Sequence, residues 1–285
     1  MYQIIPTILV QDRLEFERRL GIMQGHIPMA QMDIMDGKFV GNTTFTDPKI
    51  AARYKVDYEL DLMVADPMPY ILKWRMVRTV KRAFVHAEIK KPLAPILEKI
   101  RALGWKANVS INPDTPWEVV EPFVNPPSPL TFIAPHPNPL PRGSKTGRAS
   151  AGPGEGDWLG GKNAGNYPSP SGRGQGEGGV GGEALVDCIL FMTVYPGQNA
   201  APFQPKVIAK IRAFHVAYPN VPIAVDGGVN EKTLPLLLKA GATRFAVGSA
   251  IWSAPDPFLA YKKLSKVAGK YDANIQISSQ STNRE

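Results

Sequence analysis

Three aspartates lie within or directly after short apolar runs, and their type and spacing suit proton-transfer chemistry. Asp33 and Asp61 each lie within such a run, and Asp226 directly follows a third. Side chains alternate between the two faces of a strand, which predicts that Asp33 points inward. A buried carboxylate is costly unless it is paired, bound to metal or catalytic. Two carboxylates on opposite sides of one cavity suit two-base proton transfer at a carbon next to a carbonyl. The alternative is that these aspartates cap helices or form salt bridges to Lys or Arg.

Two glycine-containing segments follow the last two apolar runs. Gly228-Val229 comes after one, and Gly248-Ser249-Ala250 comes after the other. Glycine lets the backbone approach a ligand closely, and backbone N–H groups at the start of a helix can hold a phosphate. We therefore expect a phosphate group to bind here.

The elements that must position these residues alternate between strand and helix patterns. Apolar runs rich in β-branched residues predict strands at 3–9, 30–35, 58–64, 82–86, 106–111, 186–194, 222–225 and 244–247. Helical patterns lie at 13–23, 48–54, 69–75, 93–103, 117–123, 205–216, 231–240 and 257–267. Eight β–α repeats predict an α/β fold, a closed (β/α)8 TIM barrel formed as one domain over residues 1–268, with its site at the C-terminal strand ends. An open doubly wound sheet is the alternative, but no Gly-rich dinucleotide fingerprint follows the first strand.

The stretch 125–183 interrupts this pattern. It holds 15 of the 26 glycines and 10 of the 28 prolines. Such a composition cannot bury enough apolar surface to offset its chain entropy, so we interpret it as a disordered insert between the fifth helix and the sixth strand, on the face away from the site. Its Pro-rich and Gly/Arg-rich parts suggest a translated inverted repeat; an Arg-Gly nucleic-acid-binding segment is the alternative. Residues 269–285 are expected to form a polar, frayed tail.

Composition restricts the class of protein without deciding the function. The net charge is +8 and Cys188 is the single cysteine, so an internal disulfide is excluded. The N-terminus lacks a signal-peptide pattern and no apolar stretch is long enough to span a membrane, so we expect a cytoplasmic protein with no membrane or nucleic-acid partner. A basic surface attracts phosphates of any kind, sugar phosphates included.

Several motifs together resemble the ribulose-phosphate 3-epimerase family. The segment Asp33-Ile34-Met35-Asp36-Gly37-Lys38-Phe39-Val40 is similar to that family's signature. The segments Met192-Thr193-Val194-Tyr195-Pro196-Gly197, Val225-Asp226-Gly227-Gly228-Val229 and Gly248-Ser249-Ala250-Ile251 also fit, as do Leu62-Met63-Val64 and Asn112-Pro113 with Thr115-Pro116. The similarity is collinear from Ile5 to about Pro257, apart from the insert.

The resemblance implies a small-molecule sugar-phosphate substrate and an isomerase that interconverts D-ribulose 5-phosphate and D-xylulose 5-phosphate. Asp33 and Asp226 would be the acid–base pair that exchanges the C3 proton. The residues that would contact substrate are Thr7, Met35, Met63, Met192, Gly197, Gly227, Gly228, Gly248 and Ser249. The family tends to assemble, so a homo-oligomer is also expected.

The chain departs from the family where a divalent metal would bind. The family uses two histidines and two aspartates, but the histidine positions hold Gln31 and Asp61. Thr7 stands where the family has a serine in the first strand. The phosphate loop after the sixth strand also differs from the family's sequence over 197–201. The set Gln31, Asp33, Asp61 and Asp226 is rich in oxygen, which suits Mg or Mn better than Zn, and Fe is a further alternative.

Several readings of the site stay open. It could hold a divalent metal or work without one, and converging carboxylates favour some cation, either bound or supplied by Lys or Arg. The substrate could be a related ketohexose 6-phosphate. The barrel could instead bind a sugar phosphate without catalysis.

Overall fold

The computed structural model describes residues 2–124, 184–197 and 201–281, with side chains described as far as Tyr271. The predicted insert at 125–183 and residues 198–200 of the altered phosphate loop lie outside these ranges. The last four residues of the predicted tail also lie outside them.

Eight parallel strands close into a barrel in which each strand pairs with its neighbours along the chain. The strands are β1 (Gln3–Ile8), β2 (Met29–Met35), β3 (Asp57–Met63), β4 (Val80–His86), β5 (Lys106–Ile111), β6 (Cys188–Met192), β7 (Ile223–Asp226) and β8 (Arg244–Val247). Strand β8 pairs with β1, which closes the ring. The predicted (β/α)8 barrel is therefore confirmed.

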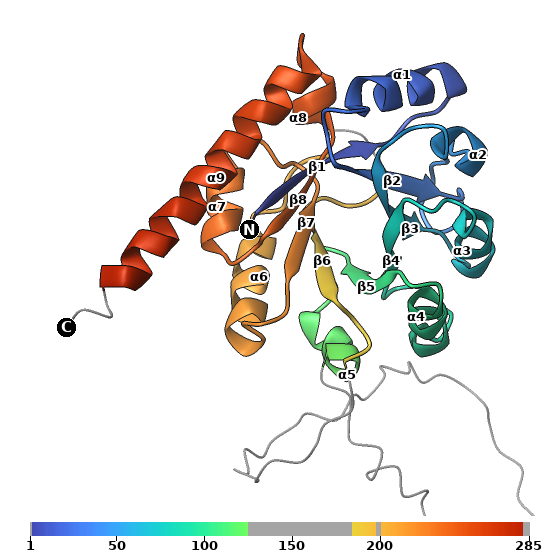
Figure 1. Cartoon of the computed structure of the whole chain (residues 1–285). Coiled ribbons are helices and arrows are strands. Elements are labelled where there is room, and N and C mark those ends of the chain that lie inside the picture. Colours follow the sequence, from blue (N-terminus) through green and yellow to red (C-terminus); the bar gives the residue numbers. More distant parts are fainter. Residues whose placement is uncertain (1, 125–183, 198–200, 282–285) are drawn as a thin grey trace, which may run out of the picture. The chain divides into compact units, whose positions relative to one another are not determined.

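Helices follow the strands and lie around the outside of the barrel (Figure 1). They are α1 (Arg13–Met23), α2 (Pro48–Ala51), α3 (Met68–Trp74), α4 (Leu93–Ala102), the 3-10 helix η1 (Trp117–Val120), α5 (Glu121–Val124), α6 (Lys206–Ala217), α7 (Leu234–Lys239), α8 (Ser249–Trp252) and α9 (Pro257–Ser281). The short α8 was not predicted. Helix α9 continues through Ser281, past the point where a frayed tail was expected.

Two apolar clusters separate the outside of the barrel wall from its interior. The larger one packs helices against the outer face of the strands and includes Met32 and Ile34 of β2. The smaller one lies inside the barrel and consists of Phe84, Cys188, Leu190, Met192, Val194 and Ala224. Because Met32 and Ile34 face the helices, their neighbours Gln31 and Asp33 face the interior, as the alternation predicts.

A buried ion cluster lies at the N-terminal ends of the strands. Glu59 of β3 accepts a hydrogen bond from Arg244 of β8, and its carboxylate lies 3.6 Å from Nε of Arg82. Glu59 is 1% exposed, so each charge has an opposite charge beside it where water is excluded. This cluster fills the end of the barrel opposite the predicted site.

The chain leaves and re-enters the barrel at one place around the 125–183 segment. The backbone N–H of Leu185 donates to the carbonyl of Phe123 over 2.9 Å.

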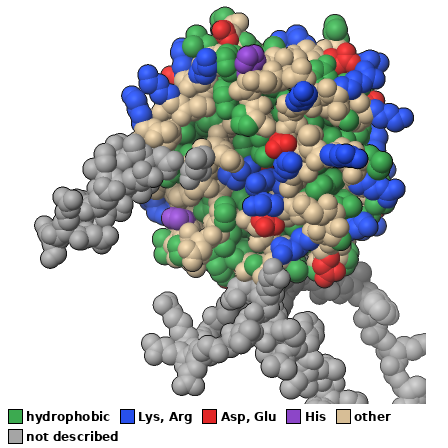
Figure 2. Space-filling view, viewed as in Figure 1, with side chains coloured by type: hydrophobic (Ala, Val, Ile, Leu, Met, Phe, Trp, Pro, Cys, Tyr) green, Lys and Arg blue, Asp and Glu red, His purple; other side chains and the backbone are tan. Residues whose placement is uncertain are grey.

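On the face drawn in Figure 2, basic side chains are more widespread than acidic ones, in line with the net charge of +8. Among the described residues, no helix combines the length and apolar character that crossing a membrane requires.

Candidate active site

A pocket opens at the C-terminal ends of the strands and gathers the predicted substrate contacts. It is lined by Thr7, Leu9, Asp33, Met35, Met63, Met192, Val194, Pro196, Gly197, Ala201, Asp226, Gly227, Gly228, Val229, Gly248 and Ser249. Both predicted catalytic aspartates and all nine predicted substrate contacts belong to this lining. Gln31 and Asp61, the predicted metal positions outside the lining, are both fully buried, and Asp61 pairs in register with Asp33. Sequence reasoning missed Leu9, Val194, Pro196, Ala201 and Val229 as lining residues.

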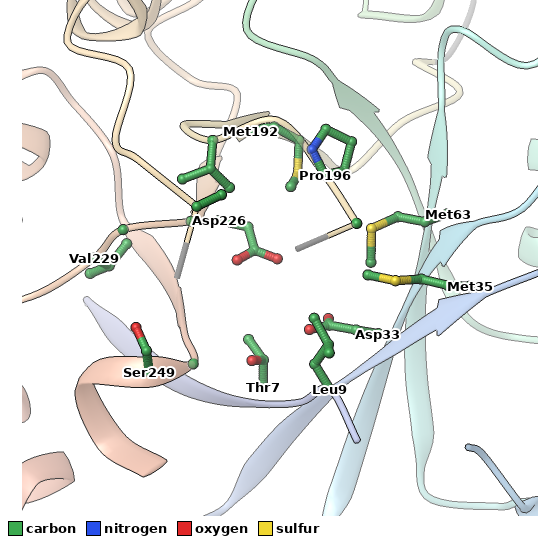
Figure 3. Close-up of a pocket in the computed structure, with 16 residues that line it drawn as sticks. Thr7, Leu9, Asp33, Met35, Met63, Met192, Pro196, Asp226, Val229 and Ser249 are labelled. Atoms are coloured by element: carbon green, nitrogen blue, oxygen red, sulfur yellow. The ribbon is translucent and has the colours of Figure 1, made fainter. Parts of the chain in front are cut away.

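Asp33 and Asp226 face the same space from different strands. Figure 3 shows their carboxylates pointing into the pocket from β2 and β7. Below them, Nε2 of Gln31 donates to Oδ1 of Asp33 over 2.8 Å and to Oδ2 of Asp226 over 2.6 Å. Gln31 is fully buried, and the exposed fractions of Asp33 and Asp226 are 3% and 9%. One carboxamide therefore fixes both carboxylates relative to each other.

The protein environment favours the protonated form of both carboxyl groups. Burial, and next the nearby Asp61 carboxylate, raise the pKa of Asp33 to about 7, against hydrogen bonds from Gln31 and Thr7 that lower it. Burial and the charges of Asp33 and Asp61 raise the pKa of Asp226 well above its usual range. At neutral pH one carboxyl can thus hold a proton while the other is partly ionised, which is the state that an acid and a base in one site require.

Asp61 has a buried imidazole beside it, which sequence reasoning did not find. Nε2 of His86 lies 3.4 Å from Oδ1 of Asp61, and Nδ1 of His86 lies 3.5 Å from Oε2 of Glu88. Ser110 donates to Asp61 over 3.2 Å. Burial favours neutral His86, but the charges of Asp61 and Glu88 prevail and raise its pKa to about 9. The expected compensating cation is therefore a histidine rather than Lys or Arg.

One signal in the sequence could have indicated this pairing. His86 is the last residue of the fourth predicted strand, and the alternation that places Asp61 inward applies equally to it. Phe39, which follows the second strand, packs on the His86 ring with 4.9 Å between ring centroids. His86 is thus fully buried.

The loop after β7 is held in a conformation that favours glycine. Gly227 and Gly228 have φ values of +104° and +61°. The hydroxyl of Thr233 donates to the carbonyl of Gly228 over 2.8 Å, and Nδ2 of Asn230 donates to the same carbonyl over 2.9 Å. Because its carbonyl accepts these two hydrogen bonds, Gly228 is held at the pocket wall, which Ser249 of α8 also lines.

The side of the pocket opposite this loop is apolar. Figure 3 shows Met35 and Met63 beside Asp33, whereas Ser249 and Val229 lie across the pocket from them. Met192 and Pro196 lie on a further side of the pocket, above Asp226 in this view. Methionine is polarizable and fills irregular space. The pocket thus has one glycine- and serine-lined wall, methionines on its other sides, and two carboxylates that project into it.

A comparison with protein-family models decides the relationship. The model of the ribulose-phosphate 3-epimerase family matches residues 3–138 and 183–252. The chain belongs to the ribulose-phosphate 3-epimerase family. It is accordingly an isomerase, an epimerase acting on carbohydrates.

Named relatives of this family cover nearly the whole chain. The chain is 27% identical over 265 residues to the cytoplasmic isoform of ribulose-phosphate 3-epimerase from Oryza sativa subsp. japonica, covering 90% of this chain and 89% of the relative. It is 26% identical over 279 residues to ribulose-phosphate 3-epimerase from Bacillus subtilis strain 168, covering 94% and 99%. Among solved structures, KGPDC from Streptococcus mutans matches with a TM-score of 0.56 at 10% identity, covering 95% of this chain and 99% of that one, which shows the fold alone.

The acidic residues of this site differ from the family's two-histidine metal centre. Asp33, Asp61 and Asp226 form a buried acidic group whose carboxylate oxygens lie within 4.8 Å of one another and could hold a metal ion. The family-type centre does not fit, because neither histidine position supplies an imidazole and Gln31 directs N–H groups toward two of the carboxylates. An N–H group is a donor and cannot ligate a metal.

Proposed function

We propose that this epimerase interconverts D-ribulose 5-phosphate and D-xylulose 5-phosphate by two-base proton transfer at C3, with Asp33 and Asp226 as the acid–base pair. One observation carries the proposal: two buried carboxylates with raised pKa values project into the same pocket and are held by one amide. The names of the relatives support the substrate pair.

The proton balance of the reaction follows from this pair. One ionised carboxylate, here Asp33, removes the C3 proton, and the C–H electron pair forms the C2–C3 double bond of an enediolate while the carbonyl oxygen gains the charge. The protonated partner, Asp226, delivers its proton to the opposite face of C3 and the carbonyl re-forms. Each turnover leaves the proton on the other aspartate, which is the correct starting state for the reverse reaction.

The two walls of the pocket suggest how the substrate lies. The backbone of Gly227, Gly228 and Gly248, together with the Ser249 hydroxyl, suits the phosphate because these groups can approach its oxygens closely. The methionines on the other sides of the pocket then cover the reacting carbons and exclude water. We also propose a cytoplasmic location, in line with the name of the rice relative.

The deciding experiment is exchange of the C3 proton of D-ribulose 5-phosphate in heavy water, followed by NMR. We expect exchange and formation of xylulose 5-phosphate with the unchanged protein and loss of both in Asp33→Asn. In Asp226→Asn we expect loss of xylulose 5-phosphate formation, whereas Asp33 still exchanges the C3 proton of ribulose 5-phosphate on its own face. Each substitution keeps the shape of the side chain but removes its proton transfer. Exchange only with a ketohexose 6-phosphate would change the substrate, and binding of both sugars without exchange would make the barrel a binding protein.

A further inference from the structure

Gln31 lies between the two proposed catalytic carboxylates and donates a hydrogen bond to each of them. Its Nε2 lies 2.8 Å from Oδ1 of Asp33 and 2.6 Å from Oδ2 of Asp226. A carboxamide has two N–H donors, and both are used here. The side chain is fully buried, so water does not compete for these bonds.

The opposite orientation of this amide is disfavoured unless a cation is present. Turning the amide would bring Oε1 to within about 3 Å of two carboxylate oxygens, and acceptors at that distance repel each other. In the orientation shown, Oε1 has no hydrogen-bond partner among the described residues. One unmade bond at a neutral oxygen costs less than the loss of two hydrogen bonds to carboxylates, which are stronger than neutral ones.

The third carboxylate is also engaged by groups of the chain itself. Oδ1 of Asp61 accepts a hydrogen bond from Ser110 over 3.2 Å and lies 3.4 Å from Nε2 of His86. One oxygen of Asp61 is therefore held by groups of β4 and β5, whereas its Oδ2 has no hydrogen-bond partner among the described residues.

We propose that the carboxamide of Gln31 replaces the family's metal ion, so that it holds Asp33 and Asp226 in register and this epimerase works without a divalent metal. The inference rests on the proposed function for its reaction, but its metal-binding part does not. Gln31 is a positioning residue, because it acts on substrate through the two aspartates. Asp61, at the second histidine position, is stabilised by His86 and Ser110 instead of by a metal.

The first test measures metal binding directly and needs no turnover. The purified protein is analysed for bound metals by mass spectrometry and is then titrated with Zn²⁺ and with Mn²⁺ in a calorimeter, beside the double variant Gln31→His with Asp61→His. We expect the double variant to bind these metal ions at least about 100-fold more tightly than the unchanged protein does. Even residues that only hydrogen-bond to metal ligands change metal affinity about 10–100-fold. Gln24→His, on the surface, controls for an added imidazole. One equivalent of tightly held metal in the unchanged protein would overturn the inference.

A single variant keeps the test decisive if the double variant does not fold. Gln31→Glu places a third carboxylate oxygen beside Asp33 and Asp226 and is expected to create divalent-cation binding that the unchanged protein lacks. If the unchanged protein binds the divalent cation as tightly as Gln31→Glu does, the acidic group already holds a cation and Gln31 does not replace it.

The second test measures the positioning role. C3 exchange by the unchanged protein should be the same with EDTA as with added Mg, Mn, Fe or Zn, and loss of exchange in EDTA would overturn the inference. In Gln31→Leu we expect kcat to fall more than KM rises, and the acid limb of the pH profile to move to higher pH because the amide no longer favours the ionised carboxylates. No exchange under any condition would refute the proposed function, whereas the metal titrations would still decide the role of Gln31.

Discussion

At the scale of the residue, the raised pKa values of the aspartate pair set the pH dependence of the reaction. Asp33 must be ionised to remove a proton, and burial together with the Asp61 charge raises its pKa to about 7. We therefore expect kcat/KM to fall about tenfold per pH unit below about pH 7. The measurement is the rate of C3 exchange between pH 5 and pH 9.

The variant Asp61→Asn tests the cause of this pKa. It removes the neighbouring negative charge while keeping the side-chain shape, so the pKa of Asp33 falls and the acid limb moves to lower pH. A limb that stays in place would show that Asp33 is not the titrating base.

The sequence predicted which residues face inward and that Asp33, Asp61 and Asp226 converge, but not the hydrogen-bond and ion-pair partners that hold them. Alternation along single strands was enough to place Asp33 and Asp61 inside the barrel, and the glycine motifs were enough to place Gly228 at the pocket wall. The Asp61–His86 pair depends on how two strands are offset in the closed barrel, and the bridge from Gln31 to Asp226 spans 195 positions of sequence. Offsets of this kind follow from the packing of the whole barrel and not from any local pattern.

At the scale of the element, the loop after β7 should tolerate no side chain at Gly228. Its φ is +61°, and a Cβ there would lie 3.0 Å from Cβ of Phe203. Gly228→Ala should therefore push the loop out of position and raise KM for the sugar phosphate about tenfold, a loss of about 1.4 kcal/mol. Steady-state kinetics of the epimerase give this KM.

A substitution at a second glycine distinguishes the effect of backbone strain from the effect of a disturbed pocket wall. Gly104 has a similar φ of +76°, but nothing lies within 4 Å of its added Cβ. Gly104→Ala should lower thermal stability by about 1 kcal/mol, as Gly228→Ala also does, yet leave KM unchanged. A rise of KM in both variants would indicate a general loosening rather than a local effect on phosphate binding.

Element ends were harder to predict than the elements themselves. The apolar run 186–194 is longer than β6, Cys188–Met192, because Val186 and Val194 are buried beyond the hydrogen-bonded strand. Hydrophobic patterns indicate burial and not strand pairing. Helix α8 has four residues, which is too short to show a period, and the polar composition after Val267 concealed the continuation of α9.

At the scale of the whole molecule, the geometry around the 125–183 segment makes its removal a clean test of the domain division that we propose. The hydrogen bond from Leu185 to Phe123 brings the chain ends on either side of it together, so a short linker can join them without distorting the barrel. The junction lies between α5 and the start of β6, whereas the pocket is at the strands' other ends. We expect the shortened chain to fold and to retain C3 exchange within about threefold of the full chain, because the junction lies at the opposite ends of the strands from the pocket.

Cys188 provides the control for folding in that experiment. It is the single cysteine, it is fully buried inside the barrel, and burial raises the pKa of its thiol to about 11, so the native protein should not react with a thiol reagent at neutral pH. Protection of Cys188 with loss of exchange in the shortened chain would assign the segment a role in the reaction. Reactive Cys188 would instead assign it a role in folding, since the barrel wall at β6 must open before the thiolate can form. Retained protection together with retained exchange would leave the described barrel as the complete catalytic unit.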